Sequence, residues 1–528
     1  MQDSDTKYDY DYAVIGSGFG GAVSALRLAE KGYRVIVLEK GRKFEPNDFP
    51  KTNWNLKRWM WLPVLKFYGF FKISFFRHIT ILSGVGVGGG SLVYANTLPV
   101  PKKEFFKADS WASLADWESE LKEHYPTALS MLNATPNQRL QTGDIALQKI
   151  GELTGRSGYF EPTNVAVYFG ESNKTVPDPY FGGEGPSRTG CNFCGGCMTG
   201  CRFGAKNTLD YNYIYFAEKK GAVIQAESEV YEIHPLKDKS GSDGYRIEWR
   251  KSTSVFRRKK YCSAKGVVFA GGVLGTVPLL LKLKKKSLPN LSDRVGYGIR
   301  TNSESLSGVI TFDKNTSFSE GVAIGSILHT DEHSHLEPVR YASGSGFWRL
   351  LLAPMVSGGN VFRRLINVAI DFIKHPVNNI KAMFVWDFAK RTQILLFMQT
   401  LNSTLRFSKC WYGMKSKMED GPAPTAFIPE SQVLVKKYAE LVNGKPVALI
   451  TETVAGIPTT AHILGGCTMG SNPQEGVIDK NHKVFNYENM YVCDGSAVSA
   501  NPGVNPSLTI TALSERAMSK IPQKIHAG

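Results

Sequence analysis

One segment near the start of the chain limits the possible fold more than any other. Residues 13–15 form an apolar run typical of a buried parallel strand. Gly16, Gly18 and Gly21 follow it with the G-x-G-x-x-G spacing. The first glycine allows a tight turn, the second lets the backbone approach a pyrophosphate, and the third lets the next helix, predicted over residues 22–31, pack against the strand. The positive end of that helix would face the pyrophosphate, so the segment predicts a Rossmann-like unit that binds an adenine dinucleotide.

An acidic residue completes this fingerprint. Residues 35–38 predict a second strand, and Glu39 closes it, 18 residues after Gly21. A carboxylate there can accept hydrogen bonds from the ribose hydroxyls of adenosine and would repel the 2′-phosphate of NADP. Because strand, glycines, helix, second strand and acid occur in order, a ligand-free turn is a poor explanation. The pattern does not distinguish FAD from NAD.

The length and the net charge of the chain limit the classes of protein to which it can belong. With 528 residues, 42% of them hydrophobic, the chain can form two or three domains with sizeable cores. Its net charge of +16 is spread along the chain, with local clusters at 257–261 and 282–286. No nucleic-acid-binding motif accompanies these clusters, so we expect no nucleic acid partner. A solvated basic surface and attraction to an anionic membrane surface both stay open.

The terminus and the apolar runs predict a location. The first residues are acidic and lack the basic region and apolar core of a signal peptide. No uninterrupted apolar stretch reaches the about 20 residues that span a bilayer. We therefore expect a cytoplasmic protein, with peripheral attachment to the inner face of the membrane as an open alternative.

Two segments favour such attachment. Residues 54–77 alternate Trp, Phe and Tyr with Lys and Arg, a mixture suited to a membrane–water boundary. Residues 347–391 contain apolar helical patterns in which only Asp371 and Asp387 oppose a set of basic residues, Arg363, Arg364, Lys374, Lys381, Lys390 and Arg391. Burial in a core is the alternative explanation for both segments.

Three further segments extend the nucleotide site. A second glycine run occupies residues 84–101, and its successive backbone N–H groups can cradle phosphate or lie along a flavin ring. Residues 266–276 predict a strand that ends in another glycine turn, and residues 490–496 predict a further strand followed by Asp494. The nucleotide-binding domain is therefore expected to be assembled from N-terminal, middle and C-terminal pieces.

These segments resemble the glucose-methanol-choline (GMC) flavoprotein oxidoreductases, in particular the cholesterol oxidase-like branch. Residues 86–101, 204–222, 461–470 and 503–517 carry the resemblance, which covers nearly the whole chain and is weakest in 310–440. It implies an α/β fold in which a discontinuous Rossmann-like FAD-binding domain joins an α+β substrate domain with a large sheet. The expected FAD-binding domain comprises residues 1–110, 205–310 and 455–528. The expected substrate domain comprises 111–204 and 311–454, including a cysteine-rich loop at 189–203.

The resemblance also implies the site residues. FAD is expected to be bound non-covalently, because 84–101 contains no histidine that could link a flavin. The expected cofactor contacts are Gly16, Gly18, Gly21, Glu39, Gly88, Gly89, Gly90, Ser91, Asn96, Val230, Gly271, Asp494 and Gly495. His462 and Asn505 match the catalytic pair of the family.

The expected reaction is the oxidation of a hydrophobic alcohol, sterol-like or long-chain. His462 can assist removal of the hydroxyl proton, and Asn505 can hold the alkoxide-like oxygen while hydride passes to the flavin. Oxygen or another acceptor would then take the electrons. A membrane-associated flavin-binding protein without alcohol chemistry is the third alternative.

One family feature is not found. Sterol oxidases also use a glutamate for double-bond isomerisation, but the corresponding region, taken as 391–404, contains no acid. Gln399 could bind a hydroxyl there but could not act as that base. Isomerisation, and sterol as the substrate, are therefore in doubt.

A cysteine run leaves the path of the electrons open. Cys191, Cys194, Cys197 and Cys201 follow the C-x2-C-x2-C-x3-C spacing of bacterial ferredoxins, without the second run of a two-cluster protein. An iron–sulfur cluster is one interpretation, and it would make the protein a dehydrogenase that passes electrons to a non-oxygen acceptor. A loop of reduced thiols without metal, or a site for zinc or redox thiols, is the alternative.

Overall fold

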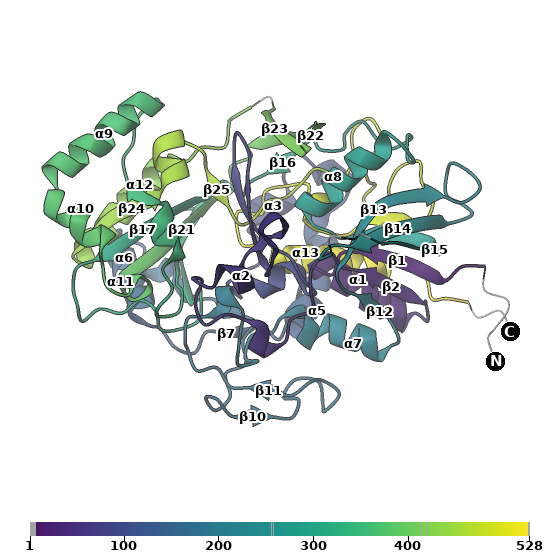
Figure 1. Ribbon diagram of the computed structural model, residues 1–528, viewed down its shortest axis with the longest axis horizontal. Coiled ribbons are helices and arrows are strands. Elements are labelled where there is room, and N and C mark those ends of the chain that lie inside the picture. Colours follow the sequence, from purple (N-terminus) through teal and green to yellow (C-terminus); the bar gives the residue numbers. More distant parts are fainter. Residues whose placement is uncertain (1–6, 255, 257, 412, 420, 526–528) are drawn as a thin grey trace.

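Two large sheets lie side by side along the long axis of the molecule (Figure 1). The computed structural model describes residues 7–254, 256, 258–411, 413–419 and 421–525. The first and the last described residues both lie at the end formed by the first sheet.

The first sheet is built around the predicted dinucleotide unit. Its strand order is β12-β2-β1-β15-β14-β13, and β26 also pairs with β15. β12, β2, β1, β15 and β26 are parallel, whereas β14 and β13 are antiparallel. The long strand β15 joins the two parts, because its first half pairs with β14 and its second half with β1. The bounds are β1 Tyr10–Ile15, β2 Val35–Leu38, β12 Val223–Gln225, β13 Ser228–Pro235, β14 Tyr245–Lys251, β15 Lys259–Phe269 and β26 Met490–Val492.

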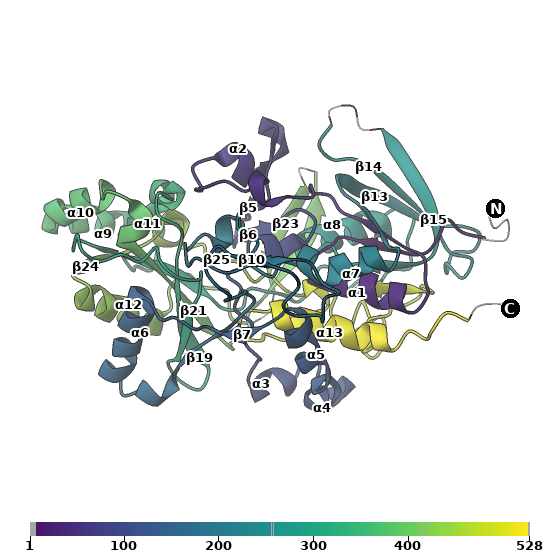
Figure 2. The same cartoon turned by 90° about the horizontal axis from the view of Figure 1, so that it is seen from below.

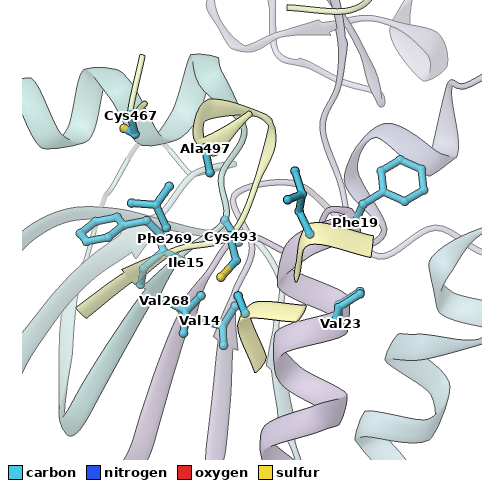
Figure 3. Close-up of a cluster of buried hydrophobic side chains, with 14 of the residues drawn as sticks. Val14, Ile15, Phe19, Val23, Val268, Phe269, Cys467, Cys493 and Ala497 are labelled. Atoms are coloured by element: carbon cyan, nitrogen blue, oxygen red, sulfur yellow. The ribbon is translucent and has the colours of Figure 1, made fainter. Parts of the chain in front are cut away.

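Helices from distant parts of the chain cover this sheet. α1 (Phe19–Glu30) packs against α7 (Tyr213–Lys219) and α13 (Ser507–Ser519), and α13 also contacts α5 (His124–Met131). One carboxylate joins three of these helices, since Glu515 binds both Arg27, at 2.7 and 2.9 Å, and the Tyr213 hydroxyl, at 2.6 Å. Figure 3 shows the apolar layer between sheet and helices, including Val14, Val23, Phe269 and Cys493.

The second sheet is antiparallel throughout. Its order is β20-β24-β17-β21-β19-β18-β8. α6 (Thr142–Leu153) and α12 (Pro429–Leu441) pack together against one face. The bounds are β8 Phe160–Pro162, β17 Ser305–Thr311, β18 Ser326–His329, β19 Ser334–Val339, β20 Leu352–Pro354, β21 Thr392–Gln399 and β24 Gly444–Leu449.

Smaller elements surround the two sheets (Figure 2). β5 (Phe71–Phe75), β6 (Thr80–Gly84) and β25 (Thr459–Thr460) form one small sheet, and β16 (Ile299–Arg300), β22 (Thr404–Cys410) and β23 (Gly413–Met418) form another. Short ladders join β3 (Trp61–Leu62) to β4 (Phe67–Tyr68), β7 (Thr135–Pro136) to β9 (Asn164–Val165), and β10 (Thr175–Val176) to β11 (Arg188–Thr189). The remaining helices are α2 Leu56–Trp59, α3 Lys103–Phe106, α4 Trp117–Leu121, α8 Val273–Lys284, α9 Val361–Lys374, α10 Pro376–Met383 and α11 Phe388–Arg391.

The predicted fold class is confirmed. N-terminal, middle and C-terminal segments all supply strands to the first sheet, and a large separate sheet accompanies it. The exact domain boundaries stay a prediction. Within the described part of the chain, no helix combines the length and apolar character that crossing a bilayer requires.

Candidate active site

A cavity of about 730 Å³ connects the two sheets. One end is walled by the glycine fingerprint, and the other by apolar residues of the second sheet such as Leu306, Ile394 and Leu396. A concave, mostly apolar cavity with a few polar groups is the usual form of a binding site.

Most of the predicted site residues meet at this cavity. Its wall includes both predicted catalytic residues, His462 and Asn505. The cofactor residues in the wall are Gly16, Gly18, Glu39, Gly89, Gly90, Val230, Gly271, Asp494 and Gly495. Four predicted residues do not line the cavity, namely Gly21, Gly88, Ser91 and Asn96. The Ser91 hydroxyl instead supports the loop behind the wall, since it donates to Gly88 O and accepts from Leu209 N.

The fingerprint turn fits a bound pyrophosphate. A Cβ at Gly18 would have no protein atom nearer than 4.0 Å, so there is room above this residue at the start of α1. A Cβ at Gly21 would instead lie 2.1 Å from Gly16 O, so this glycine serves helix packing. The second glycine run crosses directly over the first, because a Cβ at Gly89 would lie 2.7 Å from the Gly18 Cα. The space is thus left on the cavity side only.

Glu39 is positioned by the same turn. Its carboxylate accepts hydrogen bonds from Ser17 N (3.0 Å), Ser17 Oγ (2.7 Å) and Gly41 N (2.7 Å). Burial raises the pKa of Glu39, and these donors act in the opposite direction. A carboxylate has about four lone-pair sites, so acceptor capacity is left for ribose hydroxyls.

Asp494 ties the middle glycine turn to the C-terminal segment. Its side chain accepts from Gly272 N (2.8 Å), from the Thr276 hydroxyl (2.5 Å) and from Ser496 N (2.8 Å). Burial raises the pKa of Asp494, which these donors partly offset. The two segments, more than 200 residues apart in the chain, are therefore held at one point of the cavity wall.

A buried carboxylate orients His462. The imidazole follows β25, and its Nδ1 lies 2.8 Å from Oε2 of Glu304, which precedes β17 and is fully buried. The other Glu304 oxygen accepts from Ala461 N (2.8 Å) and from the Thr460 hydroxyl. An Nδ1–H that donates to this carboxylate leaves Nε2 as the acceptor. Burial alone would lower the pKa of His462, but the charge and hydrogen bond of Glu304 outweigh it and raise that pKa.

Asn505 presents one free amide oxygen. Its Nδ2 donates to Oε2 of Glu337 at 3.3 Å, and its buried Oδ1 has no hydrogen-bond partner among the described residues. A substrate hydroxyl in the cavity could donate to this oxygen.

Sequence reasoning missed both carboxylates of the site. Glu337 lies on β19, opposite Leu396 of β21 in the ladder, so a search confined to residues 391–404 examined the neighbouring strand. Residues 391–404 contain no acid, but Glu337 on the adjacent strand places a carboxylate beside Asn505. An acid at the centre of SHLEPV, residues 334–339, is the one signal that could have suggested it.

The cysteine run does not support the predicted iron–sulfur cluster. A small apolar cluster contains Cys191 with Val165 and Val167, and Cys197 and Cys201 pack against it. All four cysteines line one small cavity. Burial raises the pKa of the Cys191 thiol and raises that of Cys194 to about 11. Across the described ranges, no three or more His, Cys, Asp or Glu side chains are arranged to hold a metal ion.

Comparison with known proteins identifies flavin-dependent oxidoreductases as relatives of this chain. A family model described as "FAD binding domain" matches residues 11–48, and one described as "GMC oxidoreductase" matches residues 409–514. The chain is 46% identical to a cholesterol oxidase of Acinetobacter baumannii, covering 98% of this chain and 95% of that protein. It is 42% identical to a cholesterol oxidase of Mycobacterium tuberculosis, covering 98% and 92%.

More distant relatives share the fold. A long-chain-alcohol oxidase of Arabidopsis thaliana is 25% identical, over 97% of this chain and 67% of its own. The crystal structure of pyridoxine 4-oxidase from "Mesorbium loti" superposes with a TM-score of 0.63 at 13% identity, over 98% of this chain and 100% of its own.

Substitution of Gly18 and of Gly21 is expected to cause different defects in flavin binding and stability. Gly18→Ala places a methyl group in open space, so we expect the melting temperature of the cofactor-free protein to be unchanged and flavin content after purification to fall at least tenfold. Gly21→Ala forces the helix away from the Gly16 carbonyl, so both melting temperature and flavin content should fall. Thermal unfolding and flavin absorbance measure the two effects. Full flavin content in Gly18→Ala would contradict the pyrophosphate position.

Proposed function

This chain belongs to the GMC oxidoreductase family, in its cholesterol oxidase-like branch, and from that premise we propose that it oxidises a hydrophobic alcohol, sterol-like or long-chain. The observation that carries the proposal is the convergence of His462 and Asn505 on one cavity, between the glycine walls and the apolar end. When bound there, FAD supplies the acceptor for the hydride that leaves the alcohol carbon.

The protein's own residues handle the hydroxyl. His462 Nε2 accepts the hydrogen bond of the substrate hydroxyl and takes its proton, and Glu304 stabilises the imidazolium that forms. Asn505 Oδ1 orients the same hydroxyl from the opposite side.

The far end of the cavity favours an apolar substrate. The cavity lining there includes Leu306, Ile394 and Leu396 from the second sheet, together with Phe71 and Trp348. An alcohol with a large hydrocarbon body would bury that surface there, at about 25 cal/mol per Å². The sequence argued against sterols and isomerisation because no acid was found in residues 391–404. Glu337 is a candidate for that acid, so we include a sterol substrate and isomerisation in the proposal.

Oxygen is the acceptor we propose, because the relatives are named as oxidases. We do not propose electron transfer through an iron–sulfur cluster, because no three or more His, Cys, Asp or Glu side chains of the described residues are arranged to hold a metal ion. One molecule of oxygen should be consumed for each molecule of alcohol that is oxidised to product. A strict need for an artificial dye as electron acceptor would instead favour a dehydrogenase.

The alcohol assay tests this function directly. Anaerobic addition of sterols or long-chain alcohols to the purified flavin-loaded protein should bleach the flavin absorbance, whereas short polar alcohols should not. His462→Ala is expected to keep the flavin spectrum and lose at least about a hundredfold in turnover. If every alcohol leaves the absorbance unchanged, a flavin-binding protein without alcohol chemistry replaces this proposal. Turnover close to wild type in His462→Ala would remove the role of that residue.

Glu304 predicts a change in pH dependence. His462 must be neutral to accept a proton, and Glu304 raises its pKa, so wild-type activity rises as pH increases through that raised value. Glu304→Gln removes the charge, so the acidic limb of kcat/KM should move to lower pH by about one unit or more, with a lower maximum. The exposed Glu320→Gln serves as control. An unmoved limb at full activity would show that Glu304 does not act on the base.

We also propose that α9 and α10 dock the enzyme on a membrane. α9 is amphipathic with its polar face turned inward. Arg364 donates to Val454 O and Gly358 O, and Asp371 pairs with Lys445 at 2.7 Å. The apolar side chains point outward, with Phe362 79% and Ile373 78% exposed. Exposure of such an apolar face to water is unfavourable, whereas the face can be buried at the boundary between headgroups and acyl chains of a bilayer.

Neighbouring residues extend this surface. Large apolar side chains of and after α10 are exposed, namely Val377, Ile380, Met383, Phe384 and Trp386. Arg363, Lys374, Lys381 and Lys390 are exposed among them, which matches an anionic lipid surface. Segment 54–77 contributes less than its composition suggests, because Trp59, Trp61, Phe70 and Phe71 are buried. Its exposed large apolar side chains are Trp54, Leu62, Val64, Leu65 and Phe75.

The docking surface adjoins the apolar end of the cavity. Ala382 of α10 and Phe388 of α11 share a buried cluster with Trp348 and Phe71, three of which, Phe388, Trp348 and Phe71, also line the cavity. An alcohol dissolved in a bilayer would therefore have a short apolar route to the site.

Vesicle binding tests the docking surface. Wild-type protein should sediment with phosphatidylglycerol vesicles at low salt, and less with phosphatidylcholine vesicles or at high salt. Phe362→Ser/Ile373→Ser should reduce binding at least tenfold without changing turnover of a detergent-dissolved alcohol. Ile145→Ser/Leu153→Ser removes two exposed apolar side chains of α6 and serves as matched control. No wild-type binding, or equal loss in both double variants, would refute docking through α9.

A further inference from the structure

A line of titratable side chains crosses the second sheet toward Asn505. It runs from Glu161 on β8 through His329 on β18 to His335 and Glu337 on β19, a strand labelled in Figure 2. His329 and His335 are direct cross-strand partners. Glu161 is opposite Ile327, two residues before His329, and residues two apart in a strand share a face. All four side chains therefore project from one face of the sheet.

The spacing along this line is short. Nε2 of His329 lies 3.7 Å from Oε1 of Glu161, and the two imidazole rings meet edge to face with centroids 6.0 Å apart. Nε2 of His335 lies 3.5 Å from Oε1 of Glu337. The other Glu337 oxygen accepts from Asn505 at 3.3 Å. Each gap is within a direct contact or one bridging water.

Exposure falls steadily along the line. The side chain of Glu161 is 64% exposed, that of His329 24%, that of His335 2% and that of Glu337 0%. The line thus leads from bulk solvent to the wall of the active-site cavity.

Packing alone does not account for these residues. Their cross-strand neighbours on β21 are apolar, Met398 beside His335 and Leu396 beside Glu337. His329 Nδ1, His335 Nε2 and Glu337 Oε1 are buried and lack hydrogen-bond partners within the described ranges. Buried polar atoms without partners cost free energy, so apolar side chains would serve this face better if it only had to pack.

We propose that His335 and His329 form a proton relay that connects Glu337, beside Asn505, with solvent at Glu161. The proposal rests on the proposed alcohol oxidation, in which the hydroxyl O–H bond breaks and the C–H electron pair leaves as hydride to the cofactor. His462 first takes the released proton, as proposed above, and the charge of Glu337 also acts on this imidazole. The proton then passes to Glu337, which transfers it to Nε2 of His335. Each imidazole gives up a proton from one nitrogen as it gains one on the other, so one proton enters at Glu337 and one leaves at Glu161. Reduction of O2 to H2O2 takes up one proton, and the same path can return it.

The surroundings of His329 suit transfer rather than storage of a proton. Burial, together with His335, Lys102 and Arg156, lowers the pKa of His329 to about 4. The ring is therefore neutral near pH 7 and gives up an added proton readily. Lys102 Nζ is held by the carbonyls of Asp331 and Glu332, and Arg156 by the carbonyl of His329 itself.

Glutamine variants of the two histidines test the relay in turnover. His335→Gln and His329→Gln keep polar side chains that cannot pass a proton from one end to the other. We expect kcat to fall at least tenfold and its solvent isotope effect to rise, with KM and flavin content unchanged. Imidazole in the buffer should restore part of the rate in His329→Gln. His333→Gln, in the exposed turn between the strands, is the matched control. Wild-type kcat and isotope effect in both variants would overturn the relay. If His335→Gln does not fold, His329→Gln and the surface variant Glu161→Gln decide by the same criteria.

A second measurement separates the relay from the enzyme activity. In flavin-loaded protein without substrate, ¹⁵N NMR should show the buried His335 ring proton exchanging rapidly with water. This exchange should slow at least tenfold in His329→Gln and stay unchanged in His333→Gln. Equal exchange in all three proteins would overturn the relay even if alcohols are oxidised. If no alcohol is oxidised, the proposed function fails, and slowed exchange in His329→Gln alone would still support the conduction path.

Discussion

The close contact of backbone with backbone around the fingerprint turn is the constraint on which the rest of the structure depends. The helix after the turn reaches the Gly16 carbonyl, and the second glycine run crosses at Gly18. Because these glycines have no side chains, the fingerprint turn, the helix after it and the second glycine run pack closely against one another. Free surface is left on the cavity side only. Asp494 then fixes the middle and C-terminal segments to each other. His462 and Asn505 belong to that C-terminal part, so the chemistry of the site is positioned by the contacts that shape the cofactor wall.

Local patterns were enough to predict the first half of the site. The glycine spacing and Glu39 indicated the dinucleotide turn, and strand β2 begins and ends where the apolar run indicated. Glu304 and Glu337 were out of reach, because their contacts with His462 and Asn505 join residues 158 and 168 positions apart in the chain. Strand register is set by the whole fold, so such contacts leave no local trace in the sequence. The ferredoxin-like cysteine spacing left a metal cluster and reduced thiols as alternatives for the same reason, since the packing around these cysteines depends on distant residues.

Amphipathic periodicity has a related limit. The pattern of residues 361–374 indicated a helix with one apolar face, and a helix forms there. The pattern could not reveal which face turns inward. Arg364 and Asp371 find carbonyls and a lysine inside the molecule, so the apolar face is left outside. The specific polar contacts beneath a helix, rather than its hydrophobicity, decide here which side meets the solvent.

The order of synthesis has a consequence for the C-terminal segment that carries the proposed catalytic residues. β1 and α1 leave the ribosome before their partners β15, β26 and α13, which follow some 250 to 500 residues later. A nascent chain that has been made only as far as residue 450 has the fingerprint turn but not Asp494, His462 or Asn505. Capture of the cofactor is therefore an event that follows translation, and a chain that stalls early is a hydrophobic, flavin-free intermediate for chaperones to retain.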